Sequence, residues 1–189
     1  MYKLARLDFM EVKAVSKIKY IKKTTKAGDT IEVEKTQSAR YLRAITRGGN
    51  EKQTPKDVQE VNKRNAEKNL TRTLNANFHP GDYHMVLTYE DDSLPKTAEE
   101  AKRYLDGFLR DMRGYYAAQN AKFAYVAVTE GLARRIHHHM VVKKVDIDVL
   151  TERWPYGRVR VYPLDSPREY SKLAAYLIKE TDRTFREAR

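Results

Sequence analysis

Two short apolar segments decide the predicted fold: FAYVAVTE at residues 123–130 and RIHHHMVVKK at residues 135–144. Both are rich in β-branched and aromatic residues, a composition typical of strands. The residues between them, Gly131-Leu132-Ala133-Arg134, begin with a turn-forming glycine. The pattern therefore predicts two strands joined by a tight turn.

The elements around this hairpin alternate between strands and helices. Thr97-Ala98-Glu99-Glu100 predicts a capping box that opens a helix, and Ser166-Pro167-Arg168-Glu169 predicts another at the start of the last helix. The remaining predicted elements are a strand at 84–89, a short helix at 148–154 and a strand at 158–164. This order predicts an α+β fold of the ferredoxin-like (RRM-like) plan, an antiparallel sheet covered by helices.

A basic extension precedes this body. The net charge of the chain is +11, and residues 1–75 carry 18 basic against 9 acidic side chains, which is a net of +9. We expect a ribbon of two polar strands, at 12–23 and 29–35, and then a helix from Thr54-Pro55 to about residue 74. The predicted organisation is an N-terminal extension at 1–74 and a second domain at 75–189.

Composition limits the possible functions. The chain has no cysteine, which excludes disulfides, thiolate zinc sites and cysteine nucleophiles. The first residues, MYKLARLDFM, lack the apolar stretch of a signal peptide, and no apolar run reaches membrane-spanning length. We therefore expect a soluble protein of the cytoplasm. The basic extension favours a polyanionic partner, although a well-solvated charged surface explains the charge equally well.

Three consecutive histidines form the first candidate site. Side chains alternate between the faces of a strand, so His137 and His139 point the same way and His138 points oppositely. The hairpin brings Glu130, the end of the preceding strand, beside the start of this one. Two imidazoles and a carboxylate suit Mn²⁺, Mg²⁺ or Zn²⁺. The alternative is a polar sheet face that binds metal only adventitiously.

The last predicted helix provides a second candidate group. Tyr176 lies on the flank of its apolar face, with Lys172 one turn before it and Lys179 three residues after it. Two neighbouring ammonium groups favour the phenolate, the form that a nucleophile needs. An ordinary half-buried tyrosine with solvated lysines explains this motif equally well in isolation.

Together these motifs resemble the HUH endonuclease superfamily, specifically the rolling-circle replication initiators of bacterial phages and plasmids. The resemblance covers roughly residues 75–189. It rests on Val86-Leu87-Thr88-Tyr89, on His137-His138-His139 with the preceding Glu130, and on Tyr176-Leu177-Ile178-Lys179. The central histidine of the triplet departs from the hydrophobic residue that the family carries there.

The resemblance implies metal-dependent nicking and rejoining of single-stranded DNA at a replication origin. Glu130, His137 and His139 would hold the metal, most simply Mn²⁺ or Mg²⁺, while Tyr176 would attack the phosphate with help from Lys179. A host helicase and DNA polymerase are the further partners expected, in the cytoplasm of a bacterial host. Tyr170 is six residues from Tyr176 and on another helix face, which argues against a two-tyrosine mechanism.

Contacts to DNA are expected from both parts of the chain. In the body, Thr88 lies in the first motif and Arg135 precedes the histidines. In the ribbon, Tyr20 could stack on a base. The ribbon lysines expected to contact backbone phosphates are Lys17, Lys19, Lys22 and Lys23.

Three alternative functions remain open on the sequence. A conjugative relaxase or a transposase would perform the same chemistry in another biological setting. A DNA-binding module without catalysis would share the fold and the basic extension. A metal-binding storage or stress protein would need ligands beyond this one cluster.

Overall fold

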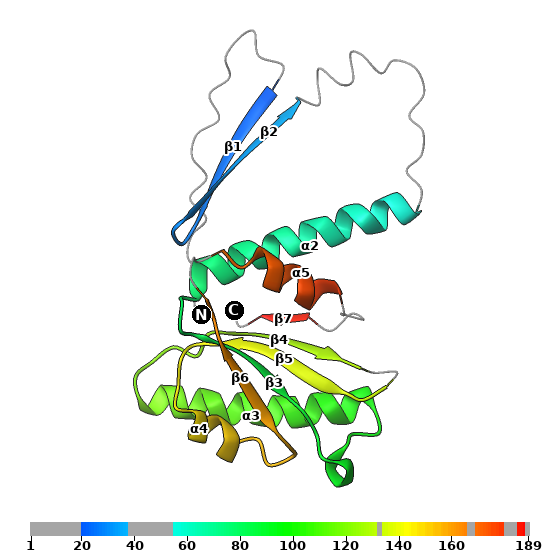
Figure 1. Ribbon diagram of the computed structural model, residues 1–189, viewed down its shortest axis with the longest axis vertical. Helices are drawn as coiled ribbons and strands as arrows, with labels where there is room; N and C mark the ends of the chain where they lie inside the picture. The colour runs from blue at the N-terminus through cyan, green and yellow to red at the C-terminus, as the bar shows by residue number, and fades with distance from the viewer. Residues whose placement is uncertain (1–19, 38–54, 132–133, 166–168, 180–184, 188–189) are drawn as a thin grey trace.

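A five-stranded antiparallel sheet forms the centre of the computed structural model (Figure 1). The structure describes residues 20–37, 55–131, 134–165, 169–179 and 185–187. The strands, in spatial order, are β6 (Val159–Pro163), β3 (Tyr83–Leu87), β5 (His137–Val142), β4 (Tyr125–Glu130) and β7 (Phe185–Glu187). Helices connect β3 to β4 and β5 to β6, which confirms the ferredoxin-like plan.

The hairpin of β4 and β5 forms at the predicted place. Glu130 at the end of β4 is paired in register with His137 at the start of β5. Gly131 follows with a φ of 75°. A Cβ at this position would lie 2.1 Å from the carbonyl oxygen of Arg135, so the turn requires glycine for its space as well as its backbone conformation.

One face of the sheet is covered by α3 (Ala98–Ala118) and α4 (Ile147–Glu152). The predicted cap of α3 is confirmed, because the Thr97 hydroxyl accepts a hydrogen bond from the Glu100 amide at 3.1 Å. This face buries aromatic and aliphatic side chains, among them Met85, Leu87, Leu105, Phe108, Met112, Met140, Leu150 and Trp154.

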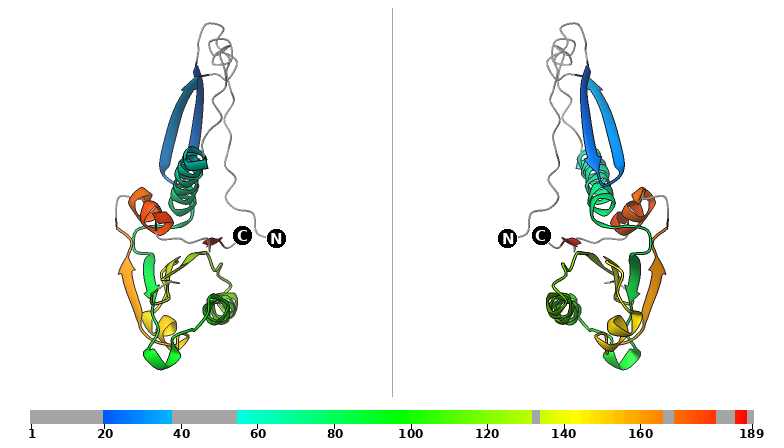
Figure 2. Two further views of the ribbon diagram at one scale, coloured as in Figure 1. Left: turned by 90° about the vertical axis from the view of Figure 1, so that its right-hand side faces the viewer. Right: turned by 90° about the vertical axis from the view of Figure 1, so that its left-hand side faces the viewer.

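The opposite face is covered by α5 (Ser171–Lys179) and α2 (Pro55–Asn77), as the side views in Figure 2 show. The second core lies between these helices and the sheet, and includes Leu70, Leu74, Phe78, Val126, Val128, Val141, Ala174 and Leu177. The predicted helix at 54–74 thus covers the body, and it continues across the expected boundary at residue 74.

The last helix begins later than predicted. The expected cap residues 166–168 lie outside the described part of the chain, and α5 starts at Ser171. The Glu169 carboxylate accepts hydrogen bonds from the amide and the hydroxyl of Ser171, at 2.9 and 2.8 Å. The amide of Tyr170 donates to the side-chain oxygen of Asn75 at 3.0 Å, which ties this start to α2.

The N-terminal ribbon consists of β1 (Tyr20–Ala27) and β2 (Thr30–Gln37). It extends away from the sheet, beyond α2 (Figure 1). The first strand was expected at 12–23, but it continues to Ala27, and its expected part before residue 20 lies outside the described residues. Gly28 turns the ribbon against α2, where a Cβ would lie 2.1 Å from the carbonyl oxygen of Asn75.

Among the helices of the described residues, none has both the length and the apolar character that crossing a membrane requires.

Candidate metal and tyrosine site

Glu130, His137 and His139 converge on the face of the sheet that carries α5. The Glu130 Oε2 atom lies 3.5 Å from His137 Nε2 and 3.4 Å from His139 Nε2. One ligand atom from each of the three residues falls within 4.8 Å of the others, so this group could hold a metal ion. The alternation of side chains along β5 brings the two histidines to one face, as the sequence predicted.

The second nitrogen of each imidazole is held outside the cluster. His137 Nδ1 lies 3.0 Å from the carbonyl oxygen of Arg135, which can only accept, so Nδ1 carries the proton and Nε2 presents a lone pair. His139 Nδ1 lies 3.1 Å from Nε2 of His84 on β3. Such second-nitrogen contacts set the ring orientation of metal-binding histidines.

Burial keeps the His139 ring neutral. Burial first, and then the charges of His84 and His137, lower the pKa of His139 to about 4. Burial also lowers the pKa of His84. A neutral imidazole is the form that binds metal. Two nitrogen lone pairs facing a buried carboxylate form a donor set that fits a divalent cation.

His138 points to the other side of the sheet, as predicted. It is fully buried in the first core, where its ring nitrogens contact the Tyr89 hydroxyl at 2.6 Å and the Thr129 hydroxyl at 2.9 Å. Its partners are therefore side chains of the core, and it takes no part in the cluster.

Tyr176 lies over the cluster from α5. Its hydroxyl is 3.4 Å from His139 Nε2, the same nitrogen that faces Glu130, and 45% of the residue is exposed. Tyr170, in contrast, precedes α5 and is buried in the second core. Lys172 and Lys179 are exposed on α5, with Lys179 in its last turn.

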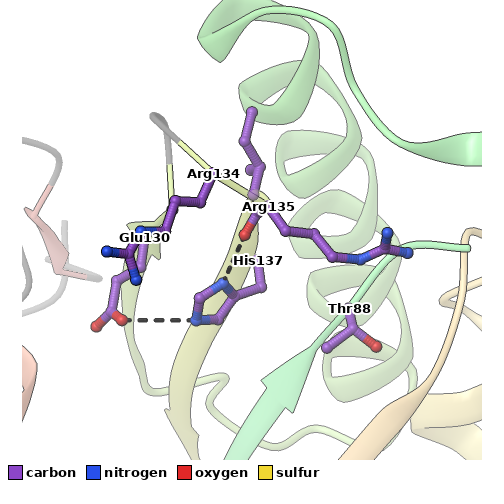
Figure 3. Close-up of a pocket in the computed structure, with 7 residues that line it drawn as sticks. Thr88, Glu130, Arg134, Arg135 and His137 are labelled. Carbon is purple, nitrogen blue, oxygen red and sulfur yellow. Dashed lines mark hydrogen bonds and ion pairs between the residues drawn. The ribbon is translucent and has the colours of Figure 1, made fainter. Parts of the chain in front are cut away.

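A pocket of about 350 Å³ opens beside the cluster (Figure 3). Thr88, Gly131 and Ile136 contribute to its lining together with Glu130 and His137. Two arginines complete it. In Figure 3, Arg134 extends toward Glu130, whereas Arg135 extends to the side of the pocket that holds Thr88. The pocket thus joins the metal-binding group to positive charge.

The two body residues expected to contact DNA both line this pocket. Arg135 is held in place by the Asp91 carboxylate and by the carbonyl oxygen of Tyr89, each at 2.6 Å. The Thr88 hydroxyl donates to the carbonyl oxygen of Arg158 at 3.1 Å. The ribbon lysines Lys22 and Lys23 lie elsewhere, beyond α2, and Lys19 and Lys17 are outside the described residues.

His84 and Arg134 were not singled out from the sequence. His84 begins an apolar segment that signals only a strand, and its contact with His139 depends on β3 and β5 being neighbours. Arg134 was read only as part of a turn. Knowledge of the strand order would have placed His84 beside the cluster, because alternation puts it on the same face of β3 as Val86, the register partner of His139.

The fold and site define a ferredoxin-like domain with a glutamate–histidine cluster beneath a helix-borne tyrosine. The sequence model of the family described as replication-associated protein ORF2 matches residues 82–184, more than half of the chain. The chain therefore belongs to this family of replication-associated proteins. Searches of curated proteins and of solved structures found no match.

Proposed function

We propose that this protein nicks and rejoins single-stranded DNA at a replication origin and thereby initiates rolling-circle replication. The observation that carries the proposal is the position of the Tyr176 hydroxyl, 3.4 Å from the nitrogen of His139 that also faces Glu130. A potential nucleophile and a potential metal site are thus adjacent. Membership of a replication-associated family supports the same function.

The proposed reaction conserves the number of phosphate ester bonds. The Tyr176 oxygen attacks the scissile phosphorus in line, the bond from phosphorus to the 3′-oxygen breaks, and the phenolic proton is lost. The departing 3′-oxygen takes up a proton. The products are a 5′-phosphotyrosine and a free 3′-hydroxyl, from which a host polymerase would extend while a host helicase separates the strands. Attack by a later 3′-hydroxyl reverses the step and closes a circle.

Glu130, His137 and His139 would hold the metal, for which we propose Mn²⁺ or Mg²⁺. When bound, such an ion polarises the phosphate and neutralises charge that develops in the transition state. His84 and the carbonyl oxygen of Arg135 keep the two rings directed at the site.

Cations around the site would assist the substrate. We assign Lys179 the role of favouring the Tyr176 phenolate or stabilising the phosphotyrosine. The pocket places Arg134 and Arg135 where backbone phosphates next to the scissile bond would lie. Thr88 would contribute a hydroxyl on the same side of the pocket.

The test is the formation of a covalent protein–DNA adduct. Purified protein is incubated with Mn²⁺ and short single-stranded oligonucleotides from a candidate origin, and the products are separated on a denaturing gel. We expect a slower band that disappears with EDTA and in Tyr176→Phe. The matched control is Tyr170→Phe on the same segment, which should retain the band. Failure of every origin-derived strand to form an adduct would overturn the proposal.

A further inference from the structure

The N-terminal ribbon has two chemically different faces. Residues paired across the two antiparallel strands share a face. One face holds the pairs Lys23 with Glu34, Thr25 with Glu32 and Ala27 with Thr30, and Thr25 and Ala27 are buried on it. This is the face that lies against α2.

The acidic side chains of β2 are paired on this inner face. The Glu34 carboxylate is ion-paired with Lys68 of α2, and Glu32 accepts a hydrogen bond from Arg72 Nε at 2.8 Å. Burial alone would raise the pKa of Glu32, but Arg72 and Lys68 hold it below its ordinary value. The contact with α2 therefore neutralises the carboxylates of the strands.

The outer face of the ribbon carries positive charge and exposed apolar groups. Its strand residues are Tyr20, Lys22, Thr24, Lys26, Ile31, Val33, Lys35 and Gln37. None of these described residues is acidic, and the nearby Asp29 lies in the turn at the ribbon's end. Ile31 is 67% exposed and Val33 is 49% exposed.

Two lysines of the outer face are placed at an energetic cost. Lys22 is the direct register partner of Lys35, and like charges in this position destabilise a pair of strands. A polyanion bound to the face would remove that repulsion. Lys22 and Lys26 are four residues apart on one strand, roughly 13 Å at the usual strand rise, which is close to the ~12 Å width of the DNA major groove.

We propose that the outer face of the ribbon binds duplex DNA in the major groove, beside the strand that is cut. A two-stranded ribbon fits this groove. Lys22, Lys26 and Lys35 would contact phosphates, and Ile31 and Val33 would meet base edges such as the thymine methyl group. The choice of DNA as partner rests on the proposed function. The ribbon lies beyond α2 from the tyrosine site, so the two would contact different parts of an origin (Figure 1).

The test compares the binding of the full-length protein to a fluorescent origin-derived duplex over a range of salt concentrations, in EDTA. In the ribbon variant, Lys22→Gln, Lys26→Gln and Lys35→Gln are combined. We expect weaker binding and a shallower plot of log affinity against log salt, by roughly 2 to 3 in slope, because each phosphate contact contributes about 0.9. The control carries the same charge change on the α3 side of the sheet, as Lys102→Gln, Arg110→Gln and Lys122→Gln, and should keep the wild-type slope.

Unchanged duplex binding in the ribbon variant would overturn the inference, as would equal losses in the ribbon variant and the control. Tighter binding of wild-type protein to anionic phosphatidylserine vesicles than to the duplex would also overturn it. The adduct assay with wild-type protein tests the proposed function separately. Ribbon-dependent duplex binding without an adduct would leave the ribbon assignment standing and remove the nicking activity.

Discussion

His139 has partners on both nitrogens of its ring. Nε2 faces Glu130 and the Tyr176 hydroxyl, while Nδ1 faces His84. The ring is 4% exposed, so none of these contacts is diluted by solvent. One buried imidazole therefore links the potential metal site, the potential nucleophile and a supporting histidine.

Replacement of His84 by phenylalanine should weaken metal binding without removing a ligand. The His84 ring stacks on His139 with centroids 5.3 Å apart, and phenylalanine keeps a ring there but loses the nitrogen that contacts Nδ1. Loss of such a supporting contact lowers metal affinity by about 10–100-fold. Calorimetric titration with Mn²⁺ measures the effect. The exposed His79→Gln should bind as wild type, and wild-type affinity in His84→Phe would refute the supporting role.

The stability of the metal-free protein should fall as the pH drops from about 6.5 to about 4. The pKa of His139 is about 4 in the folded protein and near 6.5 in the unfolded chain. In this window the unfolded chain binds a proton that the folded protein does not, so protonation favours unfolding. Urea unfolding at several pH values measures the free energy. His139→Gln should show a smaller dependence on pH across this window, and an unchanged dependence would contradict the assignment.

The turn from β4 to β5 is the element that assembles the cluster. It places the end of β4, with Glu130, beside His137, and its geometry depends on Gly131. The carbonyl oxygen of Arg135, which closes in on this glycine, is also the acceptor for His137 Nδ1. The backbone of the turn and the orientation of a metal-binding ring are thus coupled.

Gly131→Ala should both destabilise the fold and weaken metal binding. The new Cβ would overlap the Arg135 carbonyl oxygen and lie 3.2 Å from His137 Nδ1, at a positive φ that costs about 1–3 kcal/mol for alanine. Gly114→Ala in α3 is the matched control, because nothing lies within 4 Å of its Cβ. It should raise the free energy of unfolding by about 0.4–1 kcal/mol. Thermal unfolding and Mn²⁺ titration distinguish the two, and equal behaviour would contradict the role of the turn.

Local patterns were enough to predict the elements and the face of each histidine. Alternation along β5 separates His139 from His138, and the cap at Thr97 starts α3, because both depend on neighbouring residues alone. The pairing of β7 with β4 was not predicted, since it depends on contacts between distant segments. The start of α5 at Ser171 depends on Asn75, and the part of His84 depends on strand order.

The sheet separates two cores, and α2 has a function in the whole molecule that its sequence does not reveal. Its Leu70 and Leu74 close the core on the α5 side, while Lys68 and Arg72 pair with the ribbon. The same helix therefore covers the body that holds the candidate site and carries the candidate duplex-binding ribbon. This continuity links the two ends of the proposed DNA path.

The two contacts of α2 should differ in their contribution to stability. Leu74 is fully buried, so Leu74→Ala should lower the free energy of unfolding by about 2–5 kcal/mol. Arg72→Ala removes ion pairs with the partly exposed Glu32 and Glu34 and should cost about 1 kcal/mol or less. Urea unfolding measures both. A larger loss for Arg72→Ala would mean that the ribbon contact, rather than the second core, holds α2 in place.

The most direct test of the proposed chemistry is the site of the covalent DNA adduct. Trypsin cleavage after Lys172 and Lys179 releases residues 173–179, LAAYLIK, in which Tyr176 is the only hydroxyl-bearing side chain. After the attached DNA is trimmed with a nuclease, mass spectrometry should find this peptide with a 5′-phosphonucleotide attached. An adduct on the neighbouring peptide with Tyr170, or on any other residue, would contradict the assignment of Tyr176 as the nucleophile.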